Sequence, residues 1–130
     1  MATGAVYSRA RAVGSIGRGF ERWSWYFFRV SGLLLVILAL CHVLIVHVVN
    51  DVEVIHYGFV AERWRSVGWR LYDWLLLSLA LSHGMNGLRL SIDDYVHAPG
   101  HRRFWLSAAG LLYLALLAIG TATIVTFPLK

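Results

Sequence analysis

Three long apolar segments constrain the fold of this chain more than any other feature. They cover about residues 26–49, 69–92 and 104–127. A bilayer core about 30 Å thick requires roughly 20 apolar residues in a helix, because no water is present there to bond the backbone. With 130 residues, 58% of them hydrophobic, the chain is too apolar for an ordinary soluble domain. We therefore predict an all-α membrane protein with three transmembrane helices that belongs to a multi-subunit helical bundle.

Aromatic and basic residues lie at the ends of these segments. Trp23, Trp25, Trp69, Trp74 and Trp105 stand at their starts, as in the interfacial belts of membrane proteins. The formal net charge is +5, but the arginines do not form a continuous basic stripe, which argues against nucleic-acid binding. Their distribution predicts an N-terminus on the cytoplasmic side. Residues 1–25 are then a cytoplasmic segment, and residues 26–130 form a membrane-anchor domain.

The connections between the segments differ in character. Residues 50–68 mix charged and apolar side chains, which predicts a short interfacial helix. Residues 93–101 form a tight polar loop, in which we expect His97 and His101 to be solvated. Cys41 is the single cysteine and lies in an apolar run, so the chain has no disulfide framework and no zinc-type spacing.

Among the polar residues within or at the edge of the spans, four histidine or arginine positions matter most, namely Arg29, His42, His83 and Arg89. A charged side chain at such a position costs about 2.5 to 3.5 kcal/mol on insertion scales, so each needs a partner or a function. At 100° per residue, His83 shares a helix face with Gly87 and Asp94.

Two interpretations of the His83 face remain open. A neutral imidazole binds haem iron axially, and a glycine one turn away lets the flat macrocycle approach the backbone. Alternatively, His83 bonds to a neighbouring helix and Gly87 serves close helix packing. His42, which shares a stripe with Ser31, is a second candidate near a cofactor. Its depth differs from that of His83 by about 10 Å, which is awkward for two ligands of one iron. His47 is expected at the far interface.

Polar residues at the cytoplasmic ends of the first two spans also suggest a binding site. Antiparallel packing would bring Arg29 and Ser31 to the depth of Asp94 and Tyr95, where they could bind the carbonyls of a quinone and supply protons. The alternative is that Arg29 reaches the lipid headgroups, Tyr95 belongs to the aromatic belt and Asp94 opens a loop.

The segment from His83 to Tyr95 resembles the second span of the small hydrophobic cytochrome b anchor subunit of succinate dehydrogenases. That family has a haem-ligand histidine, a glycine four residues on, and an Asp-Tyr pair eleven and twelve residues on. His83, Gly87, Asp94 and Tyr95 keep this spacing. The resemblance, which covers about residues 20–127, implies that His83 is an axial ligand of haem iron and that the Tyr95 hydroxyl contacts quinone.

The first span is similar to the larger cytochrome subunit of the same complexes. Arg29-Val30-Ser31-Gly32 matches its Arg-x-Ser-Gly motif, in which a serine one turn before the arginine also helps to bind quinone. Trp25 occupies that earlier position here, with Ser24 beside it. The chain thus combines features of both anchor subunits, and Asp94-Tyr95 favours the small one.

The resemblance implies a succinate:quinone oxidoreductase subunit that is not catalytic alone and has no residues for succinate oxidation. It would help to bind haem b and ubiquinone or menaquinone, and would pass electrons from an iron-sulfur subunit to the quinone pool. A flavoprotein subunit and a second cytochrome b anchor subunit, which supplies the other haem ligand, complete the expected partners. The expected location is a bacterial-type inner membrane or the mitochondrial inner membrane, where the chain is multi-pass with its N-terminus on the cytoplasmic or matrix side.

Other functions remain open at this point. A fumarate reductase anchor would run the reaction in the opposite direction, and in a two-haem variant His42 would bind a distal haem. A non-catalytic scaffold or assembly protein would use its histidines only to hold helices together. A transporter fits least, since a single central histidine offers a poor conduction path.

Overall fold

The computed structural model describes residues 3–127, with side-chain surroundings from Arg22 onward. Three long helices dominate it. The first, α1, covers Thr3–Val43 and continues into a π-helical segment, η1, at Leu44–Val49. The short helices η2 (Val52–Val54) and α2 (Tyr57–Arg63) follow, and then the long helices α3 (Val67–Tyr95) and α4 (Pro99–Thr126). Residues 3–127 contain no strand.

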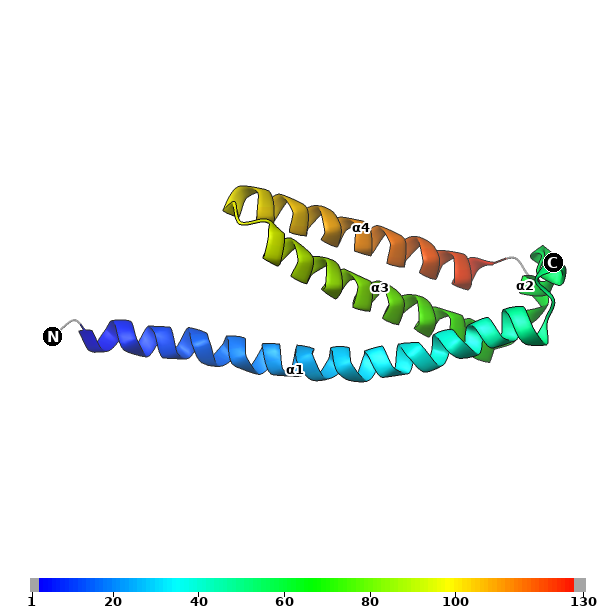
Figure 1. The fold of residues 1–130 in the computed structure, drawn as a ribbon, viewed down its shortest axis with the longest axis horizontal. Helices are drawn as coiled ribbons and strands as arrows, with labels where there is room; N and C mark the ends of the chain where they lie inside the picture. Colours follow the sequence, from blue (N-terminus) through cyan, green and yellow to red (C-terminus); the bar gives the residue numbers. More distant parts are fainter. Residues whose placement is uncertain (1–2, 128–130) are drawn as a thin grey trace.

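The long helices lie side by side, with α3 between α1 and α4 (Figure 1). Helices α3 and α4 are antiparallel and are joined by a tight turn at residues 96–98. We call this end of the bundle the turn end. The opposite end, where α1 passes through η1 to α2 and where α4 finishes, is called the α2 end. Helix α1 extends beyond the turn end (Figure 1).

The helix boundaries follow from local sequence. Pro99 opens α4, where its missing N–H would have no partner in any case. The His56 ring caps α2 by accepting from the Phe59 N–H at 3.2 Å. The connection at residues 50–68 therefore contains the short helix expected there. The three predicted spans lie within α1 with η1, within α3, and within α4 with Phe127 after it. Helix α1 is continuous across residue 25, where the predicted N-terminal segment meets the predicted first span.

Side-chain hydrogen bonds hold α3 against both neighbours. The Tyr72 hydroxyl donates to the Leu38 carbonyl of α1 at 2.6 Å. Toward α4, the Trp74 indole N–H donates to the Thr121 hydroxyl at 3.1 Å. Because these groups have few alternative partners in an apolar environment, such bonds favour one register of the helices.

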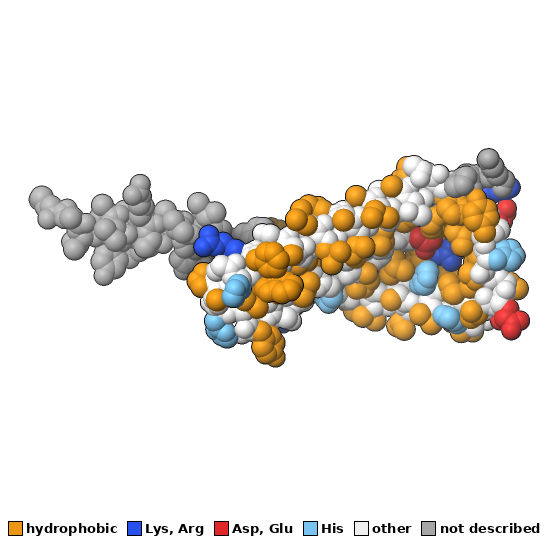
Figure 2. Space-filling model, turned by 90° about the horizontal axis from the view of Figure 1, so that it is seen from above, with side chains coloured by type: hydrophobic (Ala, Val, Ile, Leu, Met, Phe, Trp, Pro, Cys, Tyr) orange, Lys and Arg blue, Asp and Glu red, His pale blue; other side chains and the backbone are white. Residues whose placement is uncertain are grey.

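Few side chains are buried within the described part of the chain. The buried apolar residues are Ala61, Ile92, Ala109 and Ile124. Hydrophobic side chains cover much of the face shown in Figure 2, and many large ones on α1 and α4 are exposed. An apolar surface of this extent requires lipid or partner helices to cover it.

Two helical segments of the described chain are long and apolar enough to cross a bilayer, Arg22–Val49 and Pro99–Thr126. Helix α3 is not among them. Besides charged residues such as Arg70 and Asp73, it carries polar ones, such as His83 and Asn86, along its middle. The composition of the helices thus supports two of the three predicted spans, and a span within α3 stays a prediction.

Candidate functional site

His83 lies midway along α3, on the side that faces α1. Its ring lies against the α1 backbone at Gly32: a Cβ added to Gly32 would stand 3.3 Å from His83 Cε1 and 3.6 Å from Nδ1. The side chain is exposed, and no hydrogen bond to it is formed by the residues described. The imidazole is therefore positioned by packing and has a nitrogen free to bind.

The surroundings of His83 can accept a flat macrocycle. Gly87, one turn along α3 on the same face, has no atom within 4 Å of the place where its Cβ would be. Exposed apolar side chains, including Leu90, continue this face. A free imidazole with an open backbone beside it is a suitable donor set for one axial position of a b-type haem. Among the residues described, no second such imidazole lies at this depth.

His42 lies at a different depth, near the α2 end of the bundle. Its Nδ1 is 3.8 Å from a carboxylate oxygen of Asp73, whereas His83 is level with Gly32. Gly32 and His42 are ten residues apart on α1, and Asp73 and His83 are ten residues apart on α3. Ten residues correspond to roughly 15 Å along a helix. This separation exceeds the 10 Å expected from the sequence. His42 and His83 are too far apart along the bundle to be ligands of the same iron.

A groove with both apolar and polar side chains opens between α1 and α3, toward the turn end from His83, and Tyr113 of α4 also lines part of it. It consists of two adjoining cavities of about 330 and 300 Å³, which share Ser24, Phe28, Asn86 and Arg89. Arg29 lines the larger cavity. Two guanidinium groups, a hydroxyl and an amide thus converge on a groove with an aromatic wall, a composition that suits a flat ligand with carbonyl oxygens.

Trp25 has a defined part in this groove. Its ring lies 3.9 Å from the Arg29 guanidinium carbon, a close cation–π contact. Sequence comparison with the Arg-x-Ser-Gly motif expects a serine at this position. Here the indole contacts the guanidinium, while Ser24 beside it lines the groove.

The other predicted quinone residues lie elsewhere. Ser31 is 5% exposed between the helices, and its hydroxyl donates to the Phe28 carbonyl at 3.3 Å. Asp94 and Tyr95 lie at the last turn of α3, exposed, with Tyr95 84% exposed. The structure brings Arg29 together with Asn86 and Arg89 and does not place Ser31, Asp94 or Tyr95 in the lining of that groove.

Asp93 forms an ion pair next to the turn. Its carboxylate accepts from the Arg102 Nε at 2.6 Å, and Arg89 is 3.9 Å away. The hydrogen bond from Arg102 lowers the pKa of Asp93 below its ordinary value. This pair links the end of α3 to the start of α4. His97 and His101 are exposed nearby, as His47 is in η1.

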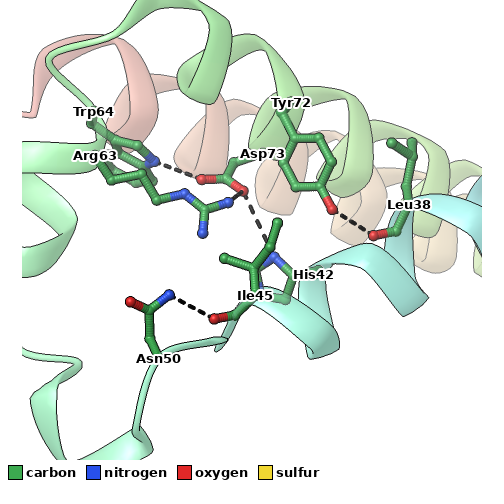
Figure 3. A network of polar contacts seen from close by, with 8 residues as sticks. All are labelled: Leu38, His42, Ile45, Asn50, Arg63, Trp64, Tyr72 and Asp73. Atoms are coloured by element: carbon green, nitrogen blue, oxygen red, sulfur yellow. Dashed lines mark hydrogen bonds and ion pairs between the residues drawn. The ribbon is translucent and has the colours of Figure 1, made fainter. Parts of the chain in front are cut away.

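Sequence analysis missed a polar network at the α2 end, which Figure 3 shows. Asp73 of α3 accepts from the Arg63 guanidinium at 3.0 Å and from the Trp64 indole N–H at 2.7 Å. The Arg63 side chain is 9% exposed and that of Asp73 is 15% exposed. The sequence did contain a signal for this network, because Asp73 is an acidic residue inside a predicted span and such a residue requires a partner. The identity of that partner depended on how α2 folds back.

The network adjoins an apolar cavity of about 460 Å³ at the junction of α1, α2 and α3. His42 lies at its edge, with its ring stacked parallel to Tyr72 at 6.5 Å between centroids. The Nδ1 atom of His42 and the Nε atom of Arg63 are buried without a hydrogen-bond partner. The α2 end thus has a packed polar centre distinct from the groove at the turn end.

Long helices with exposed apolar faces define a helical membrane subunit whose surface lipid or partner chains must cover. The chain belongs to the succinate dehydrogenase/fumarate reductase transmembrane subunit family, whose pattern it matches over residues 7–125. The predicted resemblance to a succinate dehydrogenase membrane anchor is thereby confirmed. The chain is a membrane component of an oxidoreductase complex of several subunits. No curated individual protein matches it.

Proposed function

We propose that this chain is a membrane-anchor subunit of succinate dehydrogenase that binds haem b through His83 and quinone in the groove between α1 and α3. The observation that carries the proposal is the proximity of His83 to the residues that line this groove. Asn86 and Arg89 lie three and six residues after His83 on the same helix, about 5 to 9 Å along its axis. A cofactor ligand and a carbonyl-binding groove therefore share one helix.

Helix α3 is proposed as the third transmembrane span. It lies between the two helices that are apolar enough to cross a bilayer. Its charged residues lie toward its two ends, and from Trp74 to Leu88 it has no Asp, Glu, Lys or Arg over about 22 Å. The ends are neutralised by partners, because Arg63 bonds Asp73 and Arg102 bonds Asp93. These pairs reduce the cost of placing α3 in the membrane.

Quinone reduction requires two electrons and two protons, and it places negative charge on the two carbonyl oxygens before they are protonated. The guanidinium groups of Arg29 and Arg89 and the amide of Asn86 are donors that stabilise such oxygens. Ser24 offers a hydroxyl that can donate a proton or a hydrogen bond to one of them. A b-type haem, when bound, supplies one-electron storage beside this groove.

Asp94 and Tyr95 are proposed to serve at the exposed rim of the same site. Both are accessible at the last turn of α3, so they can exchange protons with water or with a subunit docked on this end. The Arg-rich N-terminal side favours placing the turn end in the cytoplasm or the mitochondrial matrix. Electrons would then enter from a soluble partner at this end.

The remaining redox components must come from other subunits. The chain has one cysteine, Cys41, so it cannot ligate an iron-sulfur cluster alone. An iron-sulfur subunit and a flavoprotein subunit are therefore the proposed soluble partners. Since His42 lies at another depth, a companion anchor subunit is proposed to supply the second axial ligand opposite His83. His42 itself is available to a distal haem only in a two-haem variant. An anchor that serves fumarate reduction would use the same residues.

The test is to purify the tagged chain in a mild detergent from its native membrane and to record its reduced-minus-oxidised spectrum and its accompanying proteins. A b-type band that is lost in His83→Ala and retained in the matched control His97→Ala is the expected result, with a flavoprotein and an iron-sulfur protein present. An intact preparation with neither haem nor these partners would refute the proposal and favour a scaffold role.

A further inference from the structure

Gly32 of α1 lies against the His83 ring of the facing helix. A Cβ at this position would stand 3.3 Å from His83 Cε1 and 3.6 Å from Nδ1. The first distance is tighter than most contacts of real Cβ atoms, so a larger residue requires the ring or the helix to shift by a few tenths of an ångström. The absence of a side chain at Gly32 thus leaves room for the imidazole at its present position.

The other glycines near His83 do not have this role. At Gly84 and Gly87 on α3 and at Gly110 on α4, an added Cβ would meet nothing within 4 Å. Within the described part of the chain, Gly32 is the glycine whose substitution would disturb His83. This contrast separates a specific steric requirement from a general preference for small residues in packed membrane helices.

The contact also orients the ring. Cε1 and Nδ1 face Gly32, and Nε2 is not among the atoms within 4 Å of the added Cβ. Nε2 is therefore the nitrogen directed away from this contact and available to a metal. Because no described residue forms a hydrogen bond to His83, the backbone of α1 is the main element that limits the position of the ring.

We propose that Gly32 is a positioning residue for His83 and that the bare α1 backbone sets the direction in which Nε2 presents itself to haem iron. This inference rests on the proposed function, in which His83 is an axial ligand. Groups that orient a metal ligand affect metal affinity by about 10- to 100-fold. A displaced ring would also change the axial bond and thereby the redox properties of the iron.

The test compares Gly32→Ala with the matched control Gly84→Ala in the purified whole complex. The readouts are the haem content per complex, the low-spin EPR signal of the oxidised haem and its midpoint potential. We expect roughly ten-fold weaker haem retention or a shifted EPR signal and potential in Gly32→Ala. Gly84→Ala should match the unmodified protein in all three.

A double-mutant cycle distinguishes ring displacement from general damage to α1. Gly32→Ala is repeated in a His83→Ala background, and thermal unfolding of the complex is measured for all four proteins. If the ring is what the new methyl group meets, Gly32→Ala destabilises the complex only when His83 is present. Equal destabilisation in both backgrounds would overturn the inference.

The outcomes separate this inference from the proposed function. If the unmodified complex holds haem and Gly32→Ala leaves haem content, EPR signal and potential unchanged, the positioning role is refuted while the proposed function stands. If the unmodified complex holds no haem, the assignment of His83 as a ligand is refuted, and the positioning role falls with it.

Discussion

Removing the Asp73 carboxylate should destabilise the α2 end strongly. In Asp73→Ala the Arg63 guanidinium loses its 3.0 Å ion pair, and the Trp64 indole loses its 2.7 Å acceptor. The Arg63 side chain is only 9% exposed, so its charge is left with little water and without a carboxylate, and keeps its cation–π contact to the Trp69 ring at 4.2 Å. Loss of one member of such a buried pair costs about 3 to 5 kcal/mol. At 1.4 kcal/mol per factor of ten, the equilibrium changes by roughly two to four orders of magnitude.

A carboxylate of α2, at the same end of the bundle, provides the matched control. Glu62 forms an ion pair with Arg65 at 3.3 Å, but their side chains are 73% and 61% exposed. Exposed pairs contribute about 0 to 1 kcal/mol, because water screens them. Glu62→Ala should therefore change stability little. The expected difference in stability between the two variants arises because the Arg63–Asp73 pair is buried and the Arg65–Glu62 pair is exposed.

The assay is thermal unfolding of the complex in lipid nanodiscs, combined with limited proteolysis after residue 50, where a loosened α2 would become accessible. We expect Asp73→Ala to unfold at a clearly lower temperature than Glu62→Ala. A replacement of both partners, Arg63→Met with Asp73→Leu, should recover much of the loss because no charge is left buried. Equal unfolding temperatures for Asp73→Ala and Glu62→Ala would refute the reasoning.

Two further predictions concern the turn end. Trp25→Leu removes the cation–π contact to Arg29, which is worth about 0.5 to 1 kcal/mol at such a site, so KM for quinone should rise roughly two- to five-fold. The control Trp23→Leu should leave KM unchanged. An unchanged KM in Trp25→Leu would contradict the positioning of Arg29. The second prediction concerns pH: because Arg102 lowers the pKa of Asp93 below its ordinary 3.8, the stabilisation is fully present above that value and is lost as the pH falls through the lowered pKa. Unfolding of Asp93→Asn and of the unmodified complex should therefore differ at neutral pH, and the difference should shrink as the pH is lowered below 3.8 and vanish only below the lowered pKa.

Some features followed from the sequence because they depend on local physics alone. Helix length in a bilayer is set by its thickness and by the helical rise, so the apolar runs predicted three long helices at nearly the right places. The face shared by His83 and Gly87 follows from the angle between successive residues of one helix. The family motif likewise lies within one segment of α3 and needed no knowledge of its neighbours.

The groove residues show where sequence reasoning stopped. Arg29 and Arg89 were recognised as costly residues at the edge of spans, yet the partners expected for Arg29 were Asp94 and Tyr95. In the structure Arg29 lines a cavity with Asn86 and Arg89. The difference arises from the offset between α1 and α3, which no single-helix pattern contains.

Only the tertiary structure decided how the helices are shifted along one another and which distant residues became partners. Gly32 lies at the same depth as His83, and His42 at the same depth as Asp73, because of how two antiparallel helices pack. The pairing of Asp73 with Arg63 depends on α2 folding back onto α3. Apolar helices can slide with little change in buried area, because lipid and side chains are similarly apolar. Close contacts and hydrogen bonds between helices therefore determine the register, whereas the positions of the helices along the chain can be predicted from the sequence.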